Sequence, residues 1–201
     1  MRIGLDLDNT LICYDQAFLR VGKEEGILPP SFDGNKIAVK RALLAERPDG
    51  YLWEALQGLV YGRRIDAAVL FEGVGEFLEL CRQRRDTVAI VSHKTERAHH
   101  DPSLTDLRAA ALKWMEGRDF FGASGLGLER GNVYFEGTRD EKVRRIRALE
   151  CEVFIDDLPD VLSHVEMSPA CRKILFGSDR QSEFEQYASW REVCDAVFRA
   201  S

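Results

Sequence analysis

Near its N-terminus the chain reads Ile3-Gly-Leu-Asp-Leu-Asp-Asn-Thr10, in which an apolar run leads directly into two aspartates. The apolar part is continuous rather than alternating, which is typical of a parallel strand covered on both faces. We therefore predict a strand over residues 2–7. Ligands bind outside the carboxyl ends of the strands in open α/β sheets, so the acidic residues after this strand are the first candidates for a functional site.

Three further apolar runs have the same character and extend the predicted sheet. They are Thr87-Val-Ala-Ile-Val-Ser92, Cys151-Glu-Val-Phe-Ile-Asp156 and Lys173-Ile-Leu-Phe176, and a fifth strand is predicted over Asn132–Glu136. Helical patterns fit between these runs. The alternation predicts an α/β fold, with a Rossmann-like parallel sheet and helices between its strands.

Two of the predicted helices begin with the pattern of a capping box, Thr138-x-x-Glu141 and Ser189-x-x-Glu192. A third helix is predicted to lead into the second strand over residues 76–84. A fourth is predicted over residues 103–116, because its apolar residues share one side of a helix. The residues of that apolar side are Leu104, Leu107, Ala111, Trp114 and Met115.

The segment of residues 14–73 interrupts this alternation. It contains turn sequences such as Leu28-Pro-Pro30 and Phe32-Asp-Gly34, and its apolar residues recur at helical rather than strand spacing. We predict a core made of residues 1–13 and 74–201, with a small helical insertion after the first strand. An insertion at this place can cover the mouth of a site built at the strand ends.

Composition argues against several classes of protein. Of the 201 residues, 45% are hydrophobic and 31% charged, as in ordinary soluble globular proteins. The net charge of -6 argues against a nucleic-acid partner, because phosphate backbones select basic surfaces. We expect no membrane span and no signal peptide, since Asp6 and Asp8 interrupt the apolar stretch near the N-terminus. Five scattered cysteines without a C-x-x-C pair predict free thiols and a cytoplasmic protein.

Two of the predicted strands end in clusters of aspartates, at Asp6-Leu-Asp8 and at Ile155-Asp-Asp-Leu-Pro-Asp160. Carboxylates gathered at one sheet edge repel one another unless a cation neutralises them. Ligands that are all oxygen favour a hard ion, and Mg²⁺ is the usual one beside phosphate. The alternative is that these aspartates cap helices and begin turns, which explains one aspartate better than two clusters that each follow a strand.

These motifs resemble those of the haloacid-dehalogenase-like (HAD) superfamily. The stretch Ile3–Thr10 resembles its first motif, hydrophobic residues followed by D-x-D-x-T, and Phe154–Asp160 resembles its fourth. The resemblance implies that Asp6 attacks phosphorus and forms an aspartyl-phosphate. It implies that Asp8 protonates the leaving oxygen and then activates water. Dehalogenases of this type lack the second aspartate, because a halide needs no proton, so Asp8 favours phosphoryl transfer.

The second and third motifs of the family are identified here mainly by their positions in the chain. The resemblance implies that Ser92, at the end of a buried strand, holds phosphoryl oxygens and that Lys142 stabilises the transferring charge. On a helical wheel at ~100° per residue, Lys142 falls between Ile146 and Leu149, within the apolar stripe. The alternatives are a helix cap for Ser92 and a lysine that snorkels at the edge of the core for Lys142.

The resemblance assigns the remaining site residues as well. Those assigned to magnesium are Asp6, Asp8, Asp156 and Asp157, with Asp160 as an open alternative to Asp157. Those assigned to phosphate binding are Ser92, His93, Lys142 and Asn9. In the family, the residue at the position of Asp8 binds the metal through its backbone carbonyl.

We therefore predict a Mg²⁺-dependent phosphomonoesterase with a small type-one cap, which acts on a small phosphorylated metabolite such as a sugar phosphate or a nucleotide. The alternatives are a protein phosphatase or a phosphomutase with the same site, and a non-catalytic module that holds a phosphorylated ligand. We expect a monomer or a homodimer. The insertion carries Lys36, Arg63 and Arg64, for which solvated surface charge is a simpler explanation than contact with an anionic substrate.

Overall fold

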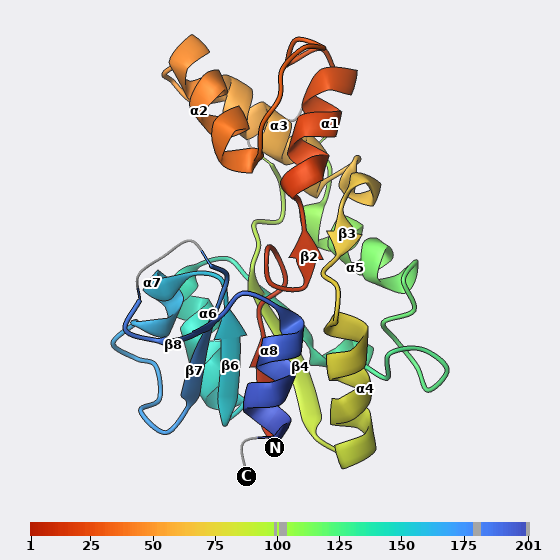
Figure 1. The fold of residues 1–201 in the computed structure, drawn as a ribbon, viewed down its shortest axis with the longest axis vertical. Coiled ribbons are helices and arrows are strands. Elements are labelled where there is room, and N and C mark those ends of the chain that lie inside the picture. Colours follow the sequence, from red (N-terminus) through yellow and green to blue (C-terminus); the bar gives the residue numbers. More distant parts are fainter. Residues whose placement is uncertain (99, 101–103, 179–181, 200–201) are drawn as a thin grey trace. The chain divides into compact units, whose positions relative to one another are not determined.

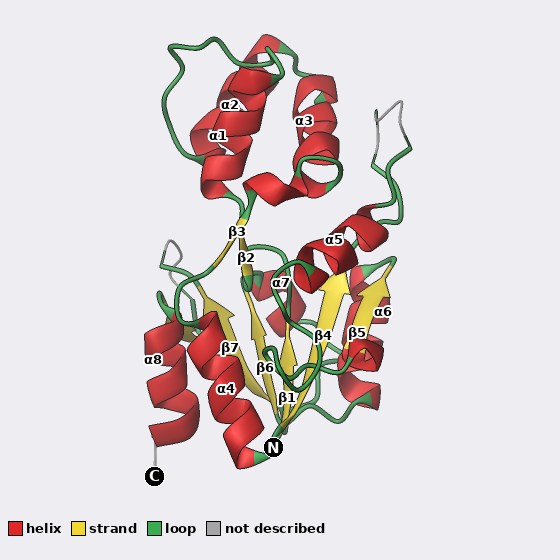
Figure 2. Ribbon diagram, turned by 90° about the vertical axis from the view of Figure 1, so that its right-hand side faces the viewer, coloured by secondary structure: helices red, strands yellow, loops and turns green. Residues whose placement is uncertain are grey.

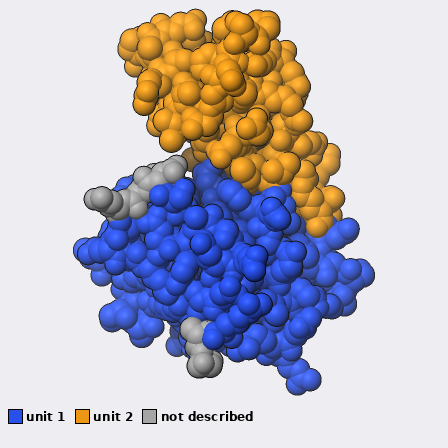
Figure 3. Space-filling model, viewed as in Figure 1, with its two compact units in different colours: residues 1–12, 70–93, 119–201 blue, residues 13–69, 94–118 orange. Residues whose placement is uncertain are grey.

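The computed structural model describes residues 1–98, 100, 104–178 and 182–199 (Figure 1). The chain forms two compact units, shown in different colours in Figure 3. The first unit comprises Met1–Ile12, Leu70–His93 and Asp119–Ser201, and the second comprises Cys13–Val69 and Lys94–Arg118.

The first unit is built on a six-stranded sheet in the order β5-β4-β1-β6-β7-β8. Its neighbouring strands all run parallel, which confirms the predicted fold class. The strands are β1 (Arg2–Leu5), β4 (Thr87–His93), β5 (Val133–Glu136), β6 (Val153–Asp156), β7 (Arg172–Phe176) and β8 (Glu185–Tyr187). The sequence does not predict β8, because this edge strand has three residues and lacks an apolar run.

The strand order places β1 between β4 and β6. Leu5, at the end of β1, pairs with Ile90 of β4 and with Ile155 of β6. The backbone N–H of Asp6 donates to the Ile155 carbonyl oxygen at 2.9 Å, so the extended chain continues for one more residue. The residues that follow β1 and those at the ends of β4 and β6 therefore lie at one edge of the sheet.

Helices cover both faces of this sheet (Figure 2). On one face, α4 (Val74–Arg84) packs with α8 (Trp190–Cys194), which continues into the helical turn η3 (Asp195–Arg199). On the other face lie α6 (Arg139–Ala148) and α7 (Pro159–Leu162), whose apolar side chains join Phe154 of β6 in one buried cluster. Burial on both faces explains why the strand sequences are continuously apolar.

Both predicted capping boxes are confirmed. The Thr138 hydroxyl accepts from the Glu141 N–H at 3.2 Å, and the Glu141 carboxylate accepts from the Thr138 N–H at 3.0 Å. Ser189 and Glu192 make the same reciprocal pair at 3.3 and 3.0 Å. Each box satisfies backbone donors that a helix N-terminus leaves without an intrahelical partner. The caps thereby set where α6 and α8 begin.

The second unit consists mainly of helices. They are α1 (Asp15–Glu24), α2 (Lys36–Glu46), α3 (Tyr51–Tyr61), the helical turn η1 (Ile65–Ala67) and α5 (Leu107–Glu116). Because α5 packs against α3 and η1, this unit includes residues 94–118, which the sequence analysis assigned to the core. The segments that join the two units contain β2 (Ile12–Cys13) and β3 (Val69–Leu70), which form a two-stranded sheet.

The start of α5 differs from the prediction. The sequence predicts a helix from Ser103, a residue outside the described ones, whereas α5 begins at Leu107. Asp106 caps it, because its carboxylate accepts from the backbone N–H of Arg108 at 2.9 Å. Leu104 therefore lies before the helix, with a φ of 49°, and its side chain is 59% exposed rather than buried.

The five cysteines are free, as predicted. Burial raises the pKa of Cys81 and of Cys151 to about 12, which keeps both thiols protonated and unreactive at neutral pH. Among the helices of the described residues, none is long and apolar enough to cross a membrane.

The central strand generates a prediction about packing. A Cβ atom added at Gly4 would lie 2.5 Å from Cδ2 of Phe154 and 2.8 Å from Sγ of Cys151. We expect Gly4→Ala to lower the free energy of unfolding by about 1–3 kcal/mol, the usual cost of overpacking a core. Urea denaturation measures this difference. Gly131→Ala is the control, because a Cβ there meets no atom within 4 Å; equal stabilities of the two variants would contradict the prediction.

Candidate active site

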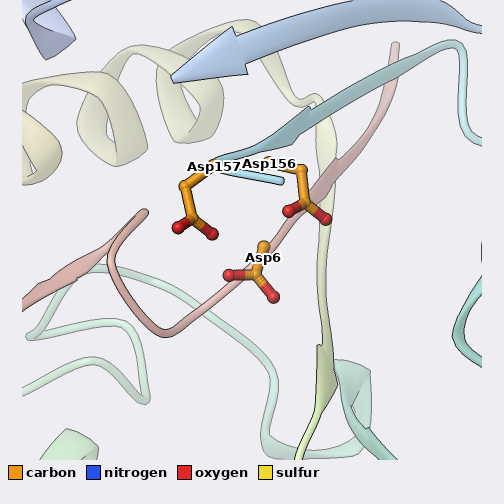
Figure 4. A group of neighbouring side chains, drawn as sticks. All are labelled: Asp6, Asp156 and Asp157. Atoms are coloured by element: carbon orange, nitrogen blue, oxygen red, sulfur yellow. The ribbon is translucent and has the colours of Figure 1, made fainter. Parts of the chain in front are cut away.

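Three aspartates meet at the carboxyl edge of the sheet. Asp6, Asp156 and Asp157 each place one carboxylate oxygen within 4.8 Å of the other two (Figure 4). Asp6 follows β1, and the other two come from the end of its neighbour β6, so the strand order brings them together. Asp6 and Asp156 are buried, with 5% and 0% exposure. An all-oxygen donor set of this kind fits a hard divalent cation such as Mg²⁺.

Lys142 brings a positive charge into this acidic group. Its Nζ donates to Oδ1 of Asp6 and to Oδ2 of Asp156, both at 2.6 Å. The side chain is 1% exposed, so Lys142 faces the interior and does not snorkel to the surface. Its place on α6 follows from the cap at Thr138, whose carbonyl accepts from the Lys142 N–H at 3.0 Å.

Burial and neighbouring charges decide the protonation of these groups. Burial raises the pKa of Asp6 well above its usual value, against the opposing effect of the Lys142 ammonium, and the Asp156 and Asp157 carboxylates raise it further. Burial alone lowers the pKa of Lys142, but the Asp156 and Asp6 carboxylates outweigh it and the net shift is upward. Lys142 therefore stays charged at neutral pH. A cation bound by the carboxylates favours the ionised form of Asp6.

A tight loop after β1 orients Asp6. The Thr10 hydroxyl donates to Oδ2 of Asp6 at 3.3 Å, and the Leu11 N–H donates back to the Leu7 carbonyl at 2.9 Å. Asn9 takes a left-handed φ of 62°, which asparagine adopts more readily than most residues. Thr10 is fully buried. Thr10 is not among the predicted site residues, although it is the last residue of the D-x-D-x-T motif, which is the signal that identifies it.

Asp8 and Asn9 lie in the same loop, and both are half-buried. The Asn9 N–H donates to the Ile12 carbonyl at 2.8 Å, which helps to close the loop. The Asp8 carboxylate is not one of the three that meet beside Lys142. Its assignment to a metal site therefore depends on the backbone carbonyl that the family resemblance implies.

Ser92 and His93 end β4 and occupy different environments. Ser92 is 1% exposed, and its hydroxyl has no hydrogen-bond partner among the described residues. It caps no helix, because β4 continues through His93. An unpaired buried hydroxyl is costly, so a ligand oxygen at this strand end would satisfy it. Successive strand residues point to opposite faces, and the exposed His93 places Nε2 3.0 Å from the Gly137 carbonyl oxygen.

The sequence leaves open whether Asp157 or Asp160 supports the metal, and these two side chains have different surroundings in the structure. Asp157 belongs to the group of three carboxylates, whereas the Asp160 side chain is 70% exposed. Asp160 accepts a hydrogen bond from Nη1 of Arg139 at 3.1 Å. Asp156 is held in place by the Leu158 N–H, which donates to its Oδ1 at 2.9 Å. Of the two, Asp157 is therefore the one whose carboxylate lies beside those of Asp6 and Asp156.

No known family model matches the sequence, and no curated protein matches it. Solved structures do match its fold. A haloacid dehalogenase-like hydrolase from Streptococcus pneumoniae superposes with a TM-score of 0.58 at 17% identity, over 97% of each chain. A HAD family hydrolase from Deinococcus radiodurans with bound phosphate and sodium has a TM-score of 0.52 at 16% identity, over 99% of this chain and 95% of its own. A predicted phosphoglycolate phosphatase from Haemophilus somnus has a TM-score of 0.51 at 13% identity, over 98% and 97%.

The chain has the HAD fold. This agrees with the motif resemblance, whose first and fourth motifs lie at residues 3–10 and 154–160. At 13–17% identity, the similarity to these solved structures shows the fold and no more. The chemistry of a HAD-fold chain depends on the residues of its own site.

Three cations of the second unit, which the sequence indicates are surface charges rather than substrate contacts, have local partners. Arg63 pairs with Glu25 at 3.1 Å, and Arg64 pairs with the same carboxylate. Nζ of Lys36 lies 3.3 Å from the Tyr61 hydroxyl. The arginines thus tie the end of α1 to the residues after α3, which supports a structural role for both.

The buried ion pairs of Lys142 generate a prediction about stability. We expect Lys142→Met to lower the free energy of unfolding of the metal-free protein by about 3–5 kcal/mol at neutral pH, because two buried carboxylates lose their counter-charge. The loss should shrink as the pH falls. The Lys142 ammonium lowers the pKa of Asp6, so its removal raises that pKa further. The folded variant then takes up a proton at higher pH than the folded wild type does, and acid stabilises the variant more than the wild type.

Urea denaturation in EDTA at several pH values measures this loss. The control is Arg144→Met on the same helix, whose side chain is 62% exposed and lies 4.0 Å from Glu166. It should change stability by less than about 0.5 kcal/mol. A Lys142→Met loss that equals the control, or that grows as the pH falls, would refute the prediction.

Proposed function

We propose that the protein is a Mg²⁺-dependent phosphomonoesterase that acts on a small phosphorylated metabolite through an aspartyl-phosphate on Asp6. The observation that carries this proposal is the meeting of the Asp6, Asp156 and Asp157 carboxylates, together with the Lys142 ammonium that donates to Asp6 and Asp156. The HAD fold places this group where open α/β sheets bind their ligands. The unpaired hydroxyl of Ser92 on the neighbouring strand supports the same location for a phosphoryl group.

The reaction proceeds in two displacements at phosphorus. In the first, a carboxylate oxygen of Asp6 attacks, the ester P–O bond breaks, and Asp8 gives a proton to the leaving oxygen. In the second, Asp8 takes a proton from water, the water oxygen attacks phosphorus, and the bond to Asp6 breaks to release phosphate. Both aspartates return to their starting states, so one difficult step becomes two easier ones.

The contacts of Asp6 suit a nucleophile. Its Oδ1 accepts from Lys142 and its Oδ2 from Thr10, so both oxygens are oriented. A carboxylate oxygen has two lone pairs, which leaves one on each oxygen for the attack. Lys142 also reduces the repulsion between the Asp6 carboxylate and an approaching phosphate, while the Ser92 hydroxyl donates to a phosphoryl oxygen.

We assign Mg²⁺ binding to the aspartates of the same site. Asp6, Asp156 and Asp157, with the backbone carbonyl of Asp8, would hold the Mg²⁺ ion. When bound, such an ion neutralises negative charge on the transferring phosphoryl group. We assign residues 14–73, which follow the Asp6 loop directly in the chain, the role of a type-one cap that limits the substrate to small molecules.

The nucleophile generates the first functional prediction. Purified protein with Mg²⁺ should release phosphate from p-nitrophenyl phosphate, and Asp6→Asn should reduce the rate to the uncatalysed background, because an amide cannot form the phosphoenzyme. Excess EDTA should have the same effect. Asp160→Asn is the control and should retain activity, because Asp160 is exposed and bound to Arg139. Full activity of Asp6→Asn, or of the wild type in EDTA, would exclude this mechanism.

The acid–base role of Asp8 generates a second functional prediction. We expect Asp8→Asn to lower steady-state kcat by about 10²–10⁴-fold, the usual contribution of general acid–base catalysis. The p-nitrophenolate ion leaves without a proton, so formation of the phosphoenzyme should be slowed far less than its hydrolysis. Stopped-flow absorbance should therefore show a burst of one p-nitrophenolate per protein molecule. Equal slowing of both phases, with no burst, would count against Asp8 as the group that activates water.

A further inference from the structure

A hydrogen bond ties the last α-helix of the described chain to the loop that carries Asp6. Nε1 of Trp190, in α8, donates to the Thr10 carbonyl oxygen at 2.9 Å across 180 residues of sequence. Both residues are fully buried. The Thr10 hydroxyl donates in turn to Oδ2 of Asp6 at 3.3 Å. Two hydrogen bonds and one residue therefore connect the indole of Trp190 with the proposed nucleophile.

The position of the indole is itself strongly constrained. The ring of Phe77 from α4 packs edge-on against it at 4.8 Å between ring centres, and Phe176 of β7 lies at 5.4 Å. The capping box of Ser189 fixes Trp190 as the first residue of α8. The backbone of Gly73 also approaches closely, since a Cβ added there would lie 2.9 Å from Cβ of Trp190. The N–H of the indole is thus preorganised for its acceptor.

The loop needs such an external contact. Its internal hydrogen bonds run from the N–H groups of Leu11 and Ile12 to the Leu7 carbonyl, both at 2.9 Å, and from the Asn9 N–H to the Ile12 carbonyl at 2.8 Å. They close the turn but do not bind the Thr10 carbonyl. A buried carbonyl without a donor is costly, so the bond from Trp190 stabilises this particular loop conformation. The next carbonyl, that of Leu11, accepts from the Phe71 N–H at 3.0 Å.

We propose that Trp190 is a positioning residue for the nucleophile. It holds the Thr10 carbonyl, which sets the place of the Thr10 hydroxyl and through it the orientation of the Asp6 carboxylate. The indole touches neither Asp6 nor any reacting atom. This inference rests on the proposed role of Asp6. Attack at phosphorus needs a fixed geometry, and a displacement of about 1 Å can cost roughly 10²-fold in rate.

The test compares two buried tryptophans. Trp190→Phe keeps an aromatic ring between Phe77 and Phe176 but removes the N–H. Trp114→Phe is the matched control, since Trp114 is 1% exposed and its Nε1 donates to the Ala68 carbonyl at 3.4 Å, within the second unit. We expect Trp190→Phe to lower kcat for p-nitrophenyl phosphate by roughly tenfold or more, with KM changed by less than about twofold. Trp114→Phe should leave kcat unchanged.

A second measurement is independent of turnover. Amide hydrogen exchange of the Leu11 and Ile12 N–H groups reports whether the loop stays closed. We expect faster exchange at these amides in Trp190→Phe than in the wild type or in Trp114→Phe. If Trp190→Phe does not fold, site-specific replacement of Trp190 by 3-benzothienylalanine removes the N–H and keeps the shape of the ring system.

The outcomes separate this inference from the proposed function. A wild type without phosphatase activity would overturn the proposed function, while the exchange rates would still show whether Trp190 positions the loop. Normal activity of the wild type and of Trp190→Phe, with unchanged exchange, would overturn the inference alone. A loss of kcat in Trp190→Phe no larger than that in Trp114→Phe would overturn it as well, because the effect would then reflect general stability.

Discussion

The double ion pair of Lys142 with Asp6 and Asp156 is the interaction on which the site depends. Removing charges from water costs several kcal/mol per ion, and close, hydrogen-bonded pairing is what offsets that cost. Here one ammonium lies 2.6 Å from an oxygen of each carboxylate, almost completely shielded from solvent. The pairing requires β6 beside β1 and a helix that is capped by Thr138. The topology of the sheet and the cap of α6 therefore both help to place Lys142 beside Asp6 and Asp156.

The charges of this arrangement do not balance. Three carboxylates against one ammonium leave two negative charges, which matches the charge of one divalent cation. Burial raises the pKa of Asp6 against the opposing effect of Lys142, and the two neighbouring carboxylates raise it further. A bound cation and a proton would compete for the same carboxylates.

Much of this could be predicted from local sequence. Continuous apolar runs identified the principal parallel strands, and both capping boxes lie where the sequence places them. The wheel position of Lys142 predicted a cation facing the interior, and the structure buries it. These features depend on residues within one or two turns of a helix, or on neighbours along one strand, so a short stretch of sequence contains the information.

Other features were decided only by the tertiary structure. Whether Asp157 or Asp160 lies beside Asp156 depends on the path of the chain from β6 into α7. It also depends on Arg139 of α6, which binds the Asp160 side chain. Residues 94–118 join the second unit because α5 packs on α3, and the bond from Trp190 to Thr10 joins segments 180 residues apart. The sequence by itself determined the five longer strands of the sheet, the caps and the acidic motifs, because periodicity and capping are local. Which side chains meet depended on long-range packing, which no local pattern encodes.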